Sequence, residues 1–439
     1  MPRRNLVLIL VSLVVSFACY DRAAHNHYAR TVATAMDIIE TYYYEPVEKR
    51  PLFENAMQGM VSRLDPYSAY VNPPSLERLN RGIEQNFVGI GILVAGPPQR
   101  PEITVISPVL GSPAHKAGIH AGDVIVEVEG QSTESLTLDQ AIGLIKGPRG
   151  TPVRIKVRRP PNDEILEFTI VRDRVKTRSV LGDTRRPDGT WNYFLREHPD
   201  IGYVRIVSFG ELTPEELREV LAFSDHPVRG LIIDLRGNPG GLLQTAVSVA
   251  DMFLDGGVIV TTRGRNGRRG DEFFATPGTV VPRDLPMVVL VDKLSASASE
   301  IVAACLQDHR RAVIVGERTW GKGTVQRIFR LEGRRSGLKL TTATYHRPSG
   351  ANIHRRQGAT EKDEWGVRPD PGYQVKLDDE TYRELYRARQ QRDVLEGEIP
   401  AEAFEVEDRQ LDRAIEAIRE LWGEKKKEPG GDQKKAVRA

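Results

Sequence analysis

Residues 287–306 read MVVLVDKLSASASEIVAACL, which is an apolar run, a serine-rich turn and a second apolar run. The five apolar residues Met287–Val291 are typical of a parallel strand that is covered on both faces. A similar unit precedes them, with the mostly apolar run Leu231–Leu235, the turn Arg236–Gly241 and helical spacing over Leu242–Phe253. Two strand–turn–helix units in series favour crossover connections, so we expect a layered α/β core.

The serine-rich turn is followed at some distance by a lysine that lies between two glycines. Ser297 is the middle serine of the turn, and Lys322 follows it by 25 residues (322 − 297). A serine hydroxyl becomes a good nucleophile when a neighbouring base takes its proton, and a neutral lysine can be that base. On a strand, Lys322 and Gln326 share one face, because side chains alternate with a period of two. This pattern predicts a serine nucleophile with a lysine base that Gln326 holds in place.

The amine of Lys322 must be uncharged to act as a base. A free lysine has a pKa of about 10.4, and lowering it to roughly 7 corresponds to about 4 kcal/mol. Burial in an apolar pocket can supply a free energy of this size, whereas a nearby carboxylate favours the charged amine. We therefore expect no acidic residue in direct contact with Lys322.

Both segments also fit other interpretations. Ser297–Glu300 has the pattern of a capping box, with a serine at the helix N-cap and a glutamate three residues on. A helix that starts after a buried strand also points its first N–H groups outward, so capping is compatible with stabilising an oxyanion. Gly316–Lys322 matches the start of a phosphate-binding loop, but Gly323 stands where a Ser or Thr should follow the lysine. Nucleotide binding is therefore disfavoured.

The chain between Gln85 and Val171 has a different sequence pattern, with short β-type runs broken by glycine and proline. The segments Pro113–Gly118 and Ala121–Ile125, in their order among these runs, resemble a PDZ domain. PDZ domains bind an extended peptide as an added strand and capture its terminal carboxylate with backbone N–H groups.

The N-terminal residues resemble a targeting segment. Arg3 and Arg4 precede an apolar run that continues to Ala18, which is the pattern of a secretory signal or an uncleaved signal anchor. The run is shorter than the roughly 20 residues of a comfortable membrane span. Residues 27–63 and 407–422 have helical spacing, and the polar residues from Lys425 onward are expected to be disordered.

Composition limits the classes of function. A chain of 439 residues is expected to form two or three domains. With 62 basic and 60 acidic residues, the net charge of +2 gives no reason to expect a nucleic acid partner. Cys19 and Cys305 are the two cysteines, so the mature body has no disulfide framework. The nine histidines lack the spacing of metal ligands, and no metal or organic cofactor is expected.

Taken together, the motifs resemble the carboxyl-terminal processing peptidases, also called tail-specific proteases. The resemblance covers roughly residues 30–375. It implies a crotonase/ClpP-like layered α/β catalytic core, with an inserted PDZ-like domain and helical N- and C-terminal parts. The segments that carry it, besides the PDZ-like part, are Leu64–Tyr70, Gly202–Ile206, Asp234–Gly241, Ser295–Gln307 and Gly321–Gln326.

The resemblance also implies a role for each matching residue. Ser297 would be the nucleophile, Lys322 the general base and Gln326 the residue that orients the lysine. Backbone N–H groups would form the oxyanion hole, from Ala298 and from Gly240 or Gly241. A loop of the PDZ-like domain would bind the terminal carboxylate of a peptide, with Val88, Gly89, Ile90 and Gly91.

We therefore expect an exported serine endopeptidase of the periplasm or cell envelope that cleaves proteins near exposed C-terminal tails. Its partners would be proteins or peptides with accessible tails, the PDZ-like domain would select substrates or gate the active site, and the N-terminal segment is a candidate membrane anchor. The helical parts are candidate contacts of a homo-oligomer. Two other classes remain open, an inactive PDZ scaffold and an acyl-thioester enzyme on a related α/β core. The expected domains are a signal peptide or anchor (1–24), a helical region (25–75), a PDZ-like domain (76–171), a catalytic domain (172–375) and a charged helical extension (376–439).

Overall fold

The computed structural model describes residues 3–24, 27–97, 102–222, 228–393 and 406–427. The chain divides into two compact units, which are formed by segments distant in the sequence. The first unit comprises residues 1–76 and 326–341, and the second comprises residues 77–325 and 342–439.

The first unit combines helices with a small antiparallel sheet. Its helices are α1 (Arg3–Ala24), α2 (His27–Tyr42) and α3 (Lys49–Val61), and α4 (Pro73–Glu84) leads out of it. The strand β1 (Ala69–Val71) pairs with the start of β20 (Ser336–His346), which also pairs with β19 (Thr324–Leu331). Phe53 of α3 meets Tyr70 of β1 edge-on, with ring centroids 6.0 Å apart. The helices predicted over residues 27–63 are therefore confirmed as α2 and α3.

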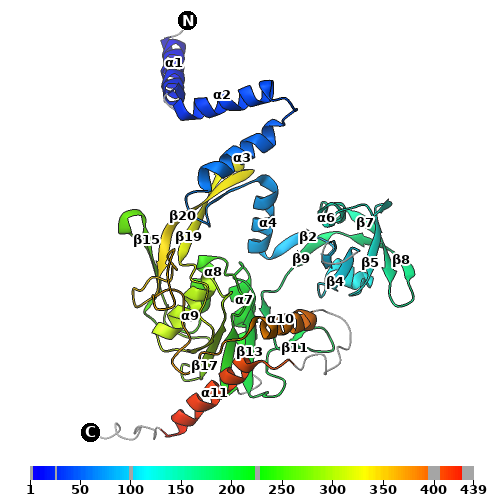
Figure 1. Cartoon of the computed structure of the whole chain (residues 1–439), viewed down its shortest axis with the longest axis vertical. Helices are drawn as coiled ribbons and strands as arrows, with labels where there is room; N and C mark the ends of the chain where they lie inside the picture. Colours follow the sequence, from blue (N-terminus) through cyan, green and yellow to red (C-terminus); the bar gives the residue numbers. More distant parts are fainter. Residues whose placement is uncertain (1–2, 25–26, 98–101, 223–227, 394–405, 428–439) are drawn as a thin grey trace. The chain divides into compact units, whose positions relative to one another are not determined.

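The PDZ-like part of the second unit has its own apolar core. An antiparallel sheet has the order β3-β4-β5-β7-β8, with β6 beside β5. Figure 1 shows β4, β5, β7 and β8 close to α6. Residues 113–117 form the short helix α5, and residues 138–145 form α6. The elements are β3 (Ile92–Ala95), β4 (Thr104–Pro108), α5 (Pro113–Ala117), β5 (Val124–Val128), β6 (Gln131–Ser132), α6 (Leu138–Ile145), β7 (Pro152–Arg159) and β8 (Glu164–Val171). The strands on either side of this part, β2 (Asn86–Gly89) and β9 (Asp173–Lys176), pair with each other.

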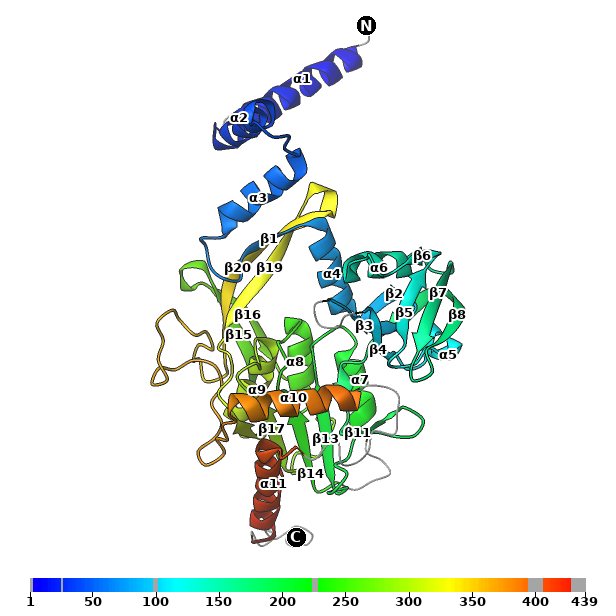
Figure 2. The ribbon, with the colours of Figure 1, turned by 45° about the vertical axis from the view of Figure 1, so that its right-hand side comes forward.

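A five-stranded sheet with the order β10-β13-β14-β17-β18 forms the centre of the α/β part of the second unit. Four strands are parallel, and three of them, β13, β14 and β17, lie side by side in Figure 2. Every residue of these three strands is buried, as the apolar sequences of β14 and β17 predicted. The bounds are β10 (Val180–Leu181), β13 (Ile201–Ile206), β14 (Gly230–Asp234), β17 (Met287–Val291) and β18 (Val313–Gly316).

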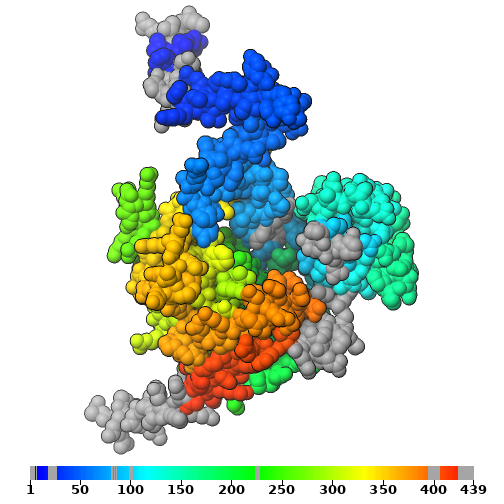
Figure 3. Space-filling view, in the orientation of Figure 1, coloured from blue at the N-terminus to red at the C-terminus, as the bar shows by residue number. Residues whose placement is uncertain are grey.

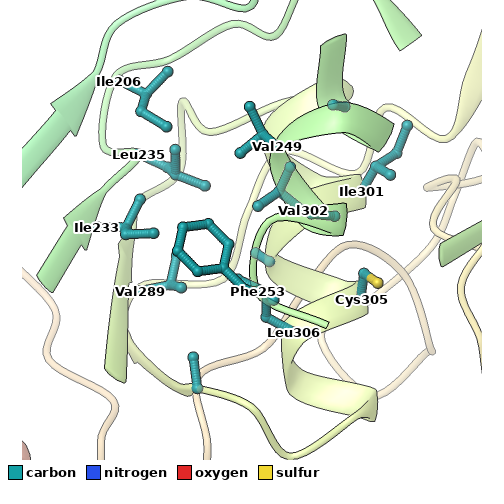
Figure 4. Packing of buried hydrophobic residues seen from close by; sticks show 14 of the residues in the cluster. Ile206, Ile233, Leu235, Val249, Phe253, Val289, Ile301, Val302, Cys305 and Leu306 are labelled. Carbon is teal, nitrogen blue, oxygen red and sulfur yellow. The ribbon is translucent and has the colours of Figure 1, made fainter. Parts of the chain in front are cut away.

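Helices cover both faces of this sheet. On one face, Phe253 packs with Ile233 and Val289 of the strands and with Val302 of α9 (Figure 4). This face carries α7 (Thr213–Leu221), α8 (Leu243–Asp251) and α9 (Ala298–Asp308). On the other face, α11 (Arg409–Lys427) packs Ala414, Ile415, Ala417 and Ile418 against Ile232, Val288, Leu290 and Val315. The expected layered α/β core is therefore present.

Further elements lie around the core. The helix α10 (Asp379–Asp393) lies next to α11 on the surface of the second unit (Figure 3). The remaining elements are β11 (Thr184–Arg185), β12 (Trp191–Asn192), β15 (Val258–Gly264), η1 (Arg265–Gly267), β16 (Arg269–Phe274) and η2 (Glu332–Arg334). Of the tail predicted to be disordered, residues 425–427 instead complete α11, and residues 428–439 lie outside the described residues.

Two features are absent from the residues that the structure describes. None of the helices that the structure describes combines the length and the hydrophobicity of a membrane-spanning segment. No group of three or more His, Cys, Asp or Glu side chains that could hold a metal ion occurs in the same residues.

Candidate active site

Ser297 lies at the N-cap of α9, directly after the turn that follows β17. Its backbone dihedrals are φ 57° and ψ −112°, a conformation that residues other than glycine rarely adopt. Such strain costs about 1–3 kcal/mol and is concentrated at functional sites. Ser297 therefore lies on a sharp strand-to-helix turn, the kind of turn that presents the nucleophile in α/β-hydrolases.

The other two serines of the run have structural partners. The Ser295 hydroxyl donates to the Leu235 carbonyl at 2.8 Å, and the Ser299 hydroxyl donates to the Asn238 carbonyl at 3.0 Å. Ser295 and Ser299 are both 0% exposed, whereas Ser297 is 9% exposed. Ser297 is therefore the serine of this run that reaches the surface.

Asn238 anchors the glycine-rich loop beside the serine turn. Its side chain donates to the Ile206 carbonyl at 2.7 Å and accepts the Gly240 N–H at 2.8 Å. Its own carbonyl accepts the Ala296 N–H at 3.0 Å. A Cβ atom on Gly240 would lie 2.8 Å from the Cβ atom of Ser297, so the glycine-rich loop and the serine turn are in direct contact.

The backbone N–H groups that were candidates for the oxyanion hole differ in their hydrogen bonds. The Gly240 N–H is donated to the Asn238 side chain, whereas the Gly241 N–H has no hydrogen bond within the part of the chain that the structure describes. Ala298 is the first residue of α9, where a backbone N–H has no acceptor within the helix. Gly241 and Ala298 are therefore the stronger candidates of the three.

Lys322 lies in the loop between β18 and β19, and Glu300 connects that loop to Ser297. The Oε2 atom of Glu300 accepts the N–H groups of Ser297 and Lys322, each at 2.8 Å. The Oε1 atom accepts the Gly321 N–H and the Thr319 hydroxyl, each at 2.6 Å. Because one oxygen binds both nitrogens, the main chains of Ser297 and Lys322 are no more than two hydrogen-bond lengths apart.

Two features of Lys322 differ from the sequence-based predictions. Lys322 precedes β19 instead of lying in it, so the strand alternation begins at Thr324. An acidic residue, Glu300, does contact Lys322, through the backbone N–H. The expectation of no acidic contact was therefore wrong, because the capping glutamate of α9 also binds the lysine loop. Burial raises the pKa of Glu300, and its hydrogen bonds with four donors oppose that rise.

Gln326 lies in β19 and belongs to the first unit, whereas Lys322 belongs to the second. The amide nitrogen of Gln326 donates to the Thr341 hydroxyl oxygen at 3.5 Å, within the first unit. That Gln326 orients the lysine amine stays a prediction.

The four candidate carboxylate-binding residues are divided between a strand and a turn. Val88 and Gly89 lie in β2 instead of in the predicted loop, because β2 pairs with β9, a strand at the far end of the PDZ-like part. Ile90 is buried in the PDZ-like core, and Gly91 follows with φ 82°. A Cβ atom on Gly91 would lie 2.3 Å from the Cβ atom of Ser112, so this turn requires glycine.

A buried ion cluster behind the glycine-rich loop was not predicted from the sequence. Arg236 donates to Asp234 and to Asp408, each at 2.7 Å, and Arg389 of α10 donates to the same two carboxylates at 3.1 Å and 3.2 Å. Burial acts to raise the pKa values of Asp234 and Asp408, but the two guanidinium groups hold these pKa values below their usual range. Asp234 and Arg236 belong to a recognisable motif, but the other two members, Arg389 and Asp408, lie far along the chain, and no spacing rule connects them with it.

Family models match three parts of the chain. Residues 200–371 match peptidase family S41, residues 104–159 match a PDZ domain, and residues 19–74 match the N-terminal domain of the activating protease CtpB. These matches define a serine-type peptidase that carries a PDZ domain.

Relatives match over most of the chain. The carboxy-terminal-processing protease of Bartonella bacilliformis is 35% identical over 435 residues, which is 94% of each chain. The carboxy-terminal processing protease CtpB of Bacillus subtilis is 33% identical over 328 residues, 74% of this chain and 65% of that protein. Among solved structures, the photosystem II D1 C-terminal processing protease is 31% identical, with a TM-score of 0.43, over 77% of this chain and 86% of that one. The chain therefore belongs to the carboxy-terminal processing proteases of peptidase family S41, which confirms the predicted family and the predicted class of enzyme.

Proposed function

We propose that Ser297 is the nucleophile and Lys322 the general base of this carboxy-terminal processing protease. The observation that carries the proposal is the shared Glu300 oxygen, which binds the N–H groups of both residues at 2.8 Å. The neutral amine takes the hydroxyl proton while the serine oxygen bonds to the carbonyl carbon of the scissile peptide. The lysinium then gives that proton to the leaving amine as the C–N bond breaks. Water, deprotonated by the same amine, hydrolyses the acyl-enzyme and restores the serine.

The oxyanion that forms during this attack would be bound by the backbone N–H groups of Ala298 and Gly241. The Gly240 N–H is a weaker candidate, because the Asn238 side chain already accepts it at 2.8 Å. The contact of Gly240 with Ser297 keeps the following residue, Gly241, close to the serine turn. Each donor of this kind contributes about 2.7–4 kcal/mol to stabilising the transition state.

The loop that carries Lys322 is held firmly enough to support a base. The carbonyl groups of its two glycine neighbours, Gly321 and Gly323, accept the N–H groups of Arg355 and Tyr345, each at 2.8 Å. Three consecutive residues therefore have backbone hydrogen bonds to other segments. A base held in this way can meet the serine with little loss of orientation.

Cleavage of casein, and of a folded protein with an unstructured C-terminal tail, tests the dyad. Ser297→Ala and Lys322→Ala are each expected to lower kcat by about 10⁴-fold or more, and Gln326→Ala by less. The control is Ser299→Ala, which loses one buried hydrogen bond worth about 0.5–1.5 kcal/mol and should still cleave. Equal proteolysis by the wild type and both dyad variants would reject the proposal.

The PDZ domain is proposed to select substrates by their accessible C-terminal tails and to gate the active site. The candidate carboxylate-binding residues are Val88, Gly89, Ile90 and Gly91. Binding of a tail peptide with a free or an amidated C-terminus tests this part, because capture by backbone N–H groups requires the carboxylate. Equal affinity for the two peptides would reject it.

Export is proposed from the basic and apolar N-terminal residues, with the periplasm or cell envelope as the location and a membrane anchor if the segment is not cleaved. N-terminal sequencing of protein purified from cells decides whether the segment is removed. The helical parts are proposed as contacts of a homo-oligomer, which the mass in solution tests. The proposed domains are residues 1–24, 25–75, 76–171, 172–375 and 376–439.

A further inference from the structure

Glu300 is a carboxylate with no exposed surface, and its contacts are divided between two segments. A helix cap needs only its bond with the Ser297 N–H, which is 2.8 Å long. Glu300 also accepts three donors from the lysine loop, the Thr319 hydroxyl and the N–H groups of Gly321 and Lys322. One side chain of α9 therefore connects the serine turn to the lysine loop.

The donors around Glu300 suit a carboxylate and no other side chain of similar size. A carboxylate accepts about four hydrogen bonds on its two oxygens, whereas a glutamine amide has one acceptor oxygen and a donor NH₂ group. Glutamine at this position would turn its NH₂ group either toward the N–H groups of Ser297 and Lys322 or toward the Gly321 N–H and the Thr319 hydroxyl. Because the site is closed to solvent, water could not replace the lost acceptor.

Thr319, whose hydroxyl donates to the Oε1 atom of Glu300, is itself held in place. The Thr319 hydroxyl donates to Glu300 and accepts the Val367 N–H at 2.7 Å. A Cβ atom on Gly366 would lie 2.8 Å from that hydroxyl oxygen, so the surroundings are closely packed. The carboxylate therefore has little freedom to follow a shifted lysine loop.

We propose that Glu300 is a positioning residue, which sets the distance between the Ser297 hydroxyl and the Lys322 amine by holding both main chains on one carboxylate oxygen. This inference rests on the proposed dyad. Glu300 touches no reacting atom, and it acts through the backbones of the two residues. Removing its charge without changing its size should leave substrate binding intact and slow the chemical step.

The test compares Glu300→Gln with a matched variant, Glu216→Gln. Glu216 is also a buried carboxylate of the second unit, and it accepts the N–H groups of Ser179 and Val180 at 2.8 Å and 3.1 Å. Glu300→Gln is expected to lower kcat for a tailed substrate by about 100-fold, the effect of a misplacement of about 1 Å. KM of Glu300→Gln should stay within about twofold, because the loss of an interaction made only in the transition state lowers kcat without changing KM. Glu216→Gln should keep kcat within about threefold of the wild-type value. An unchanged kcat in Glu300→Gln would overturn the inference.

A double-mutant cycle separates positioning from a general loss of structure. Hydrolysis of an activated ester is measured for Lys322→Ala with and without Glu300→Gln, because oxyanion donors sustain a residual rate without the base. We expect the second substitution to cost less than about threefold there, since groups that act as a unit are not additive. A full 100-fold loss in that background would overturn the inference. Failure of the proposed dyad would look different, because Lys322→Ala would then be as active as the wild type.

Thermal unfolding shows whether Glu300→Gln folds. If it does not, Glu300→Asp keeps the carboxylate on a shorter side chain, and we expect it to fold with a kcat reduced at least about tenfold, because the shorter arm shifts the lysine loop. Glu216→Asp is the paired control, since it shortens a buried carboxylate that binds the N–H groups of Ser179 and Val180, and it should retain most of the wild-type kcat. Full activity of Glu300→Asp, or an equal loss in Glu216→Asp, would overturn the inference.

Discussion

A methyl group on Gly240 would occupy space that the serine turn already fills. Its Cβ atom would lie 2.7 Å from the Ala296 carbonyl oxygen and 2.8 Å from the Ser297 Cβ atom, at a φ of 102°. We expect Gly240→Ala to lower kcat by about 100-fold, because it shifts the nucleophile. The control is Gly278→Ala, which has a similar φ of 105° and no atom within 4 Å of the added carbon. Similar activities of the two variants would show that the contact has no catalytic consequence.

The thiol of Cys305 is expected to be inert in the folded protein. It is fully buried in α9, and burial raises its pKa to about 12. Because the thiolate is the reactive form, a Cys19→Ser variant should not react with iodoacetamide at neutral pH until it is unfolded. Labelling can be followed by mass spectrometry with and without denaturant. Rapid modification of the native variant would contradict the burial of this side chain.

At the scale of residues, the sequence predicted what depends on neighbours in the chain. The start of α9 at Ser297 followed from a buried strand, a serine N-cap and a glutamate three residues on. The second role of Glu300 did not follow, because its other donors, Thr319 and Gly321, come from a separate loop. Capping rules describe one helix end and carry no information about a second segment that uses the same carboxylate.

At the scale of elements, α10 is connected to the end of β14 by ion pairs that are largely shielded from solvent. Arg389 of α10 donates to Asp234, which is fully buried, and to Asp408, whose side chain is 11% exposed. Removing one partner of a buried ion pair costs about 3–5 kcal/mol, so Arg389→Met should lower the free energy of unfolding by that amount. Arg387→Met, at an exposed position of the same helix, should change it by less than about 0.5 kcal/mol. Urea denaturation of both variants measures the difference, and equal stabilities would show that the cluster does not hold α10 in place.

Elements with a strong local pattern were the ones predicted correctly. β17 has five apolar residues in succession, and α9 begins at the capping box of Ser297 and Glu300. By contrast, Val88 and Gly89 were assigned to a loop, although they pair with β9 at the other end of the PDZ domain. Such pairing is decided by the folded domain between the two strands, and the local sequence does not record it.

For the whole molecule, stability is expected to fall in acid. The folded pKa values of Asp234 and Asp408 lie below the unfolded value of about 3.9, so their ionised forms stabilise the fold fully above that pH. As the pH falls below about 4, the unfolded chain takes up protons first, and the stabilisation is lost progressively. Urea denaturation between pH 2 and pH 7 should show this decline, with a smaller slope in Arg389→Met. A flat profile would mean that the cluster is not ionised in the fold.

The PDZ domain can be excised at a point where its two ends already pair. Gly89 of β2 lies opposite Asp173 of β9 in an antiparallel pair, so a two-residue Asn-Gly turn can replace residues 90–172 and close a hairpin. If the domain gates the active site, its removal should change kcat for short peptides by about 5–150-fold, the usual size of coupling between sites. If it only selects substrates, kcat for short peptides should stay constant while KM for a tailed protein rises. We expect kcat for short peptides to change, because a domain inserted between two paired strands is connected to the core through both strands. An unchanged kcat for short peptides would reject gating.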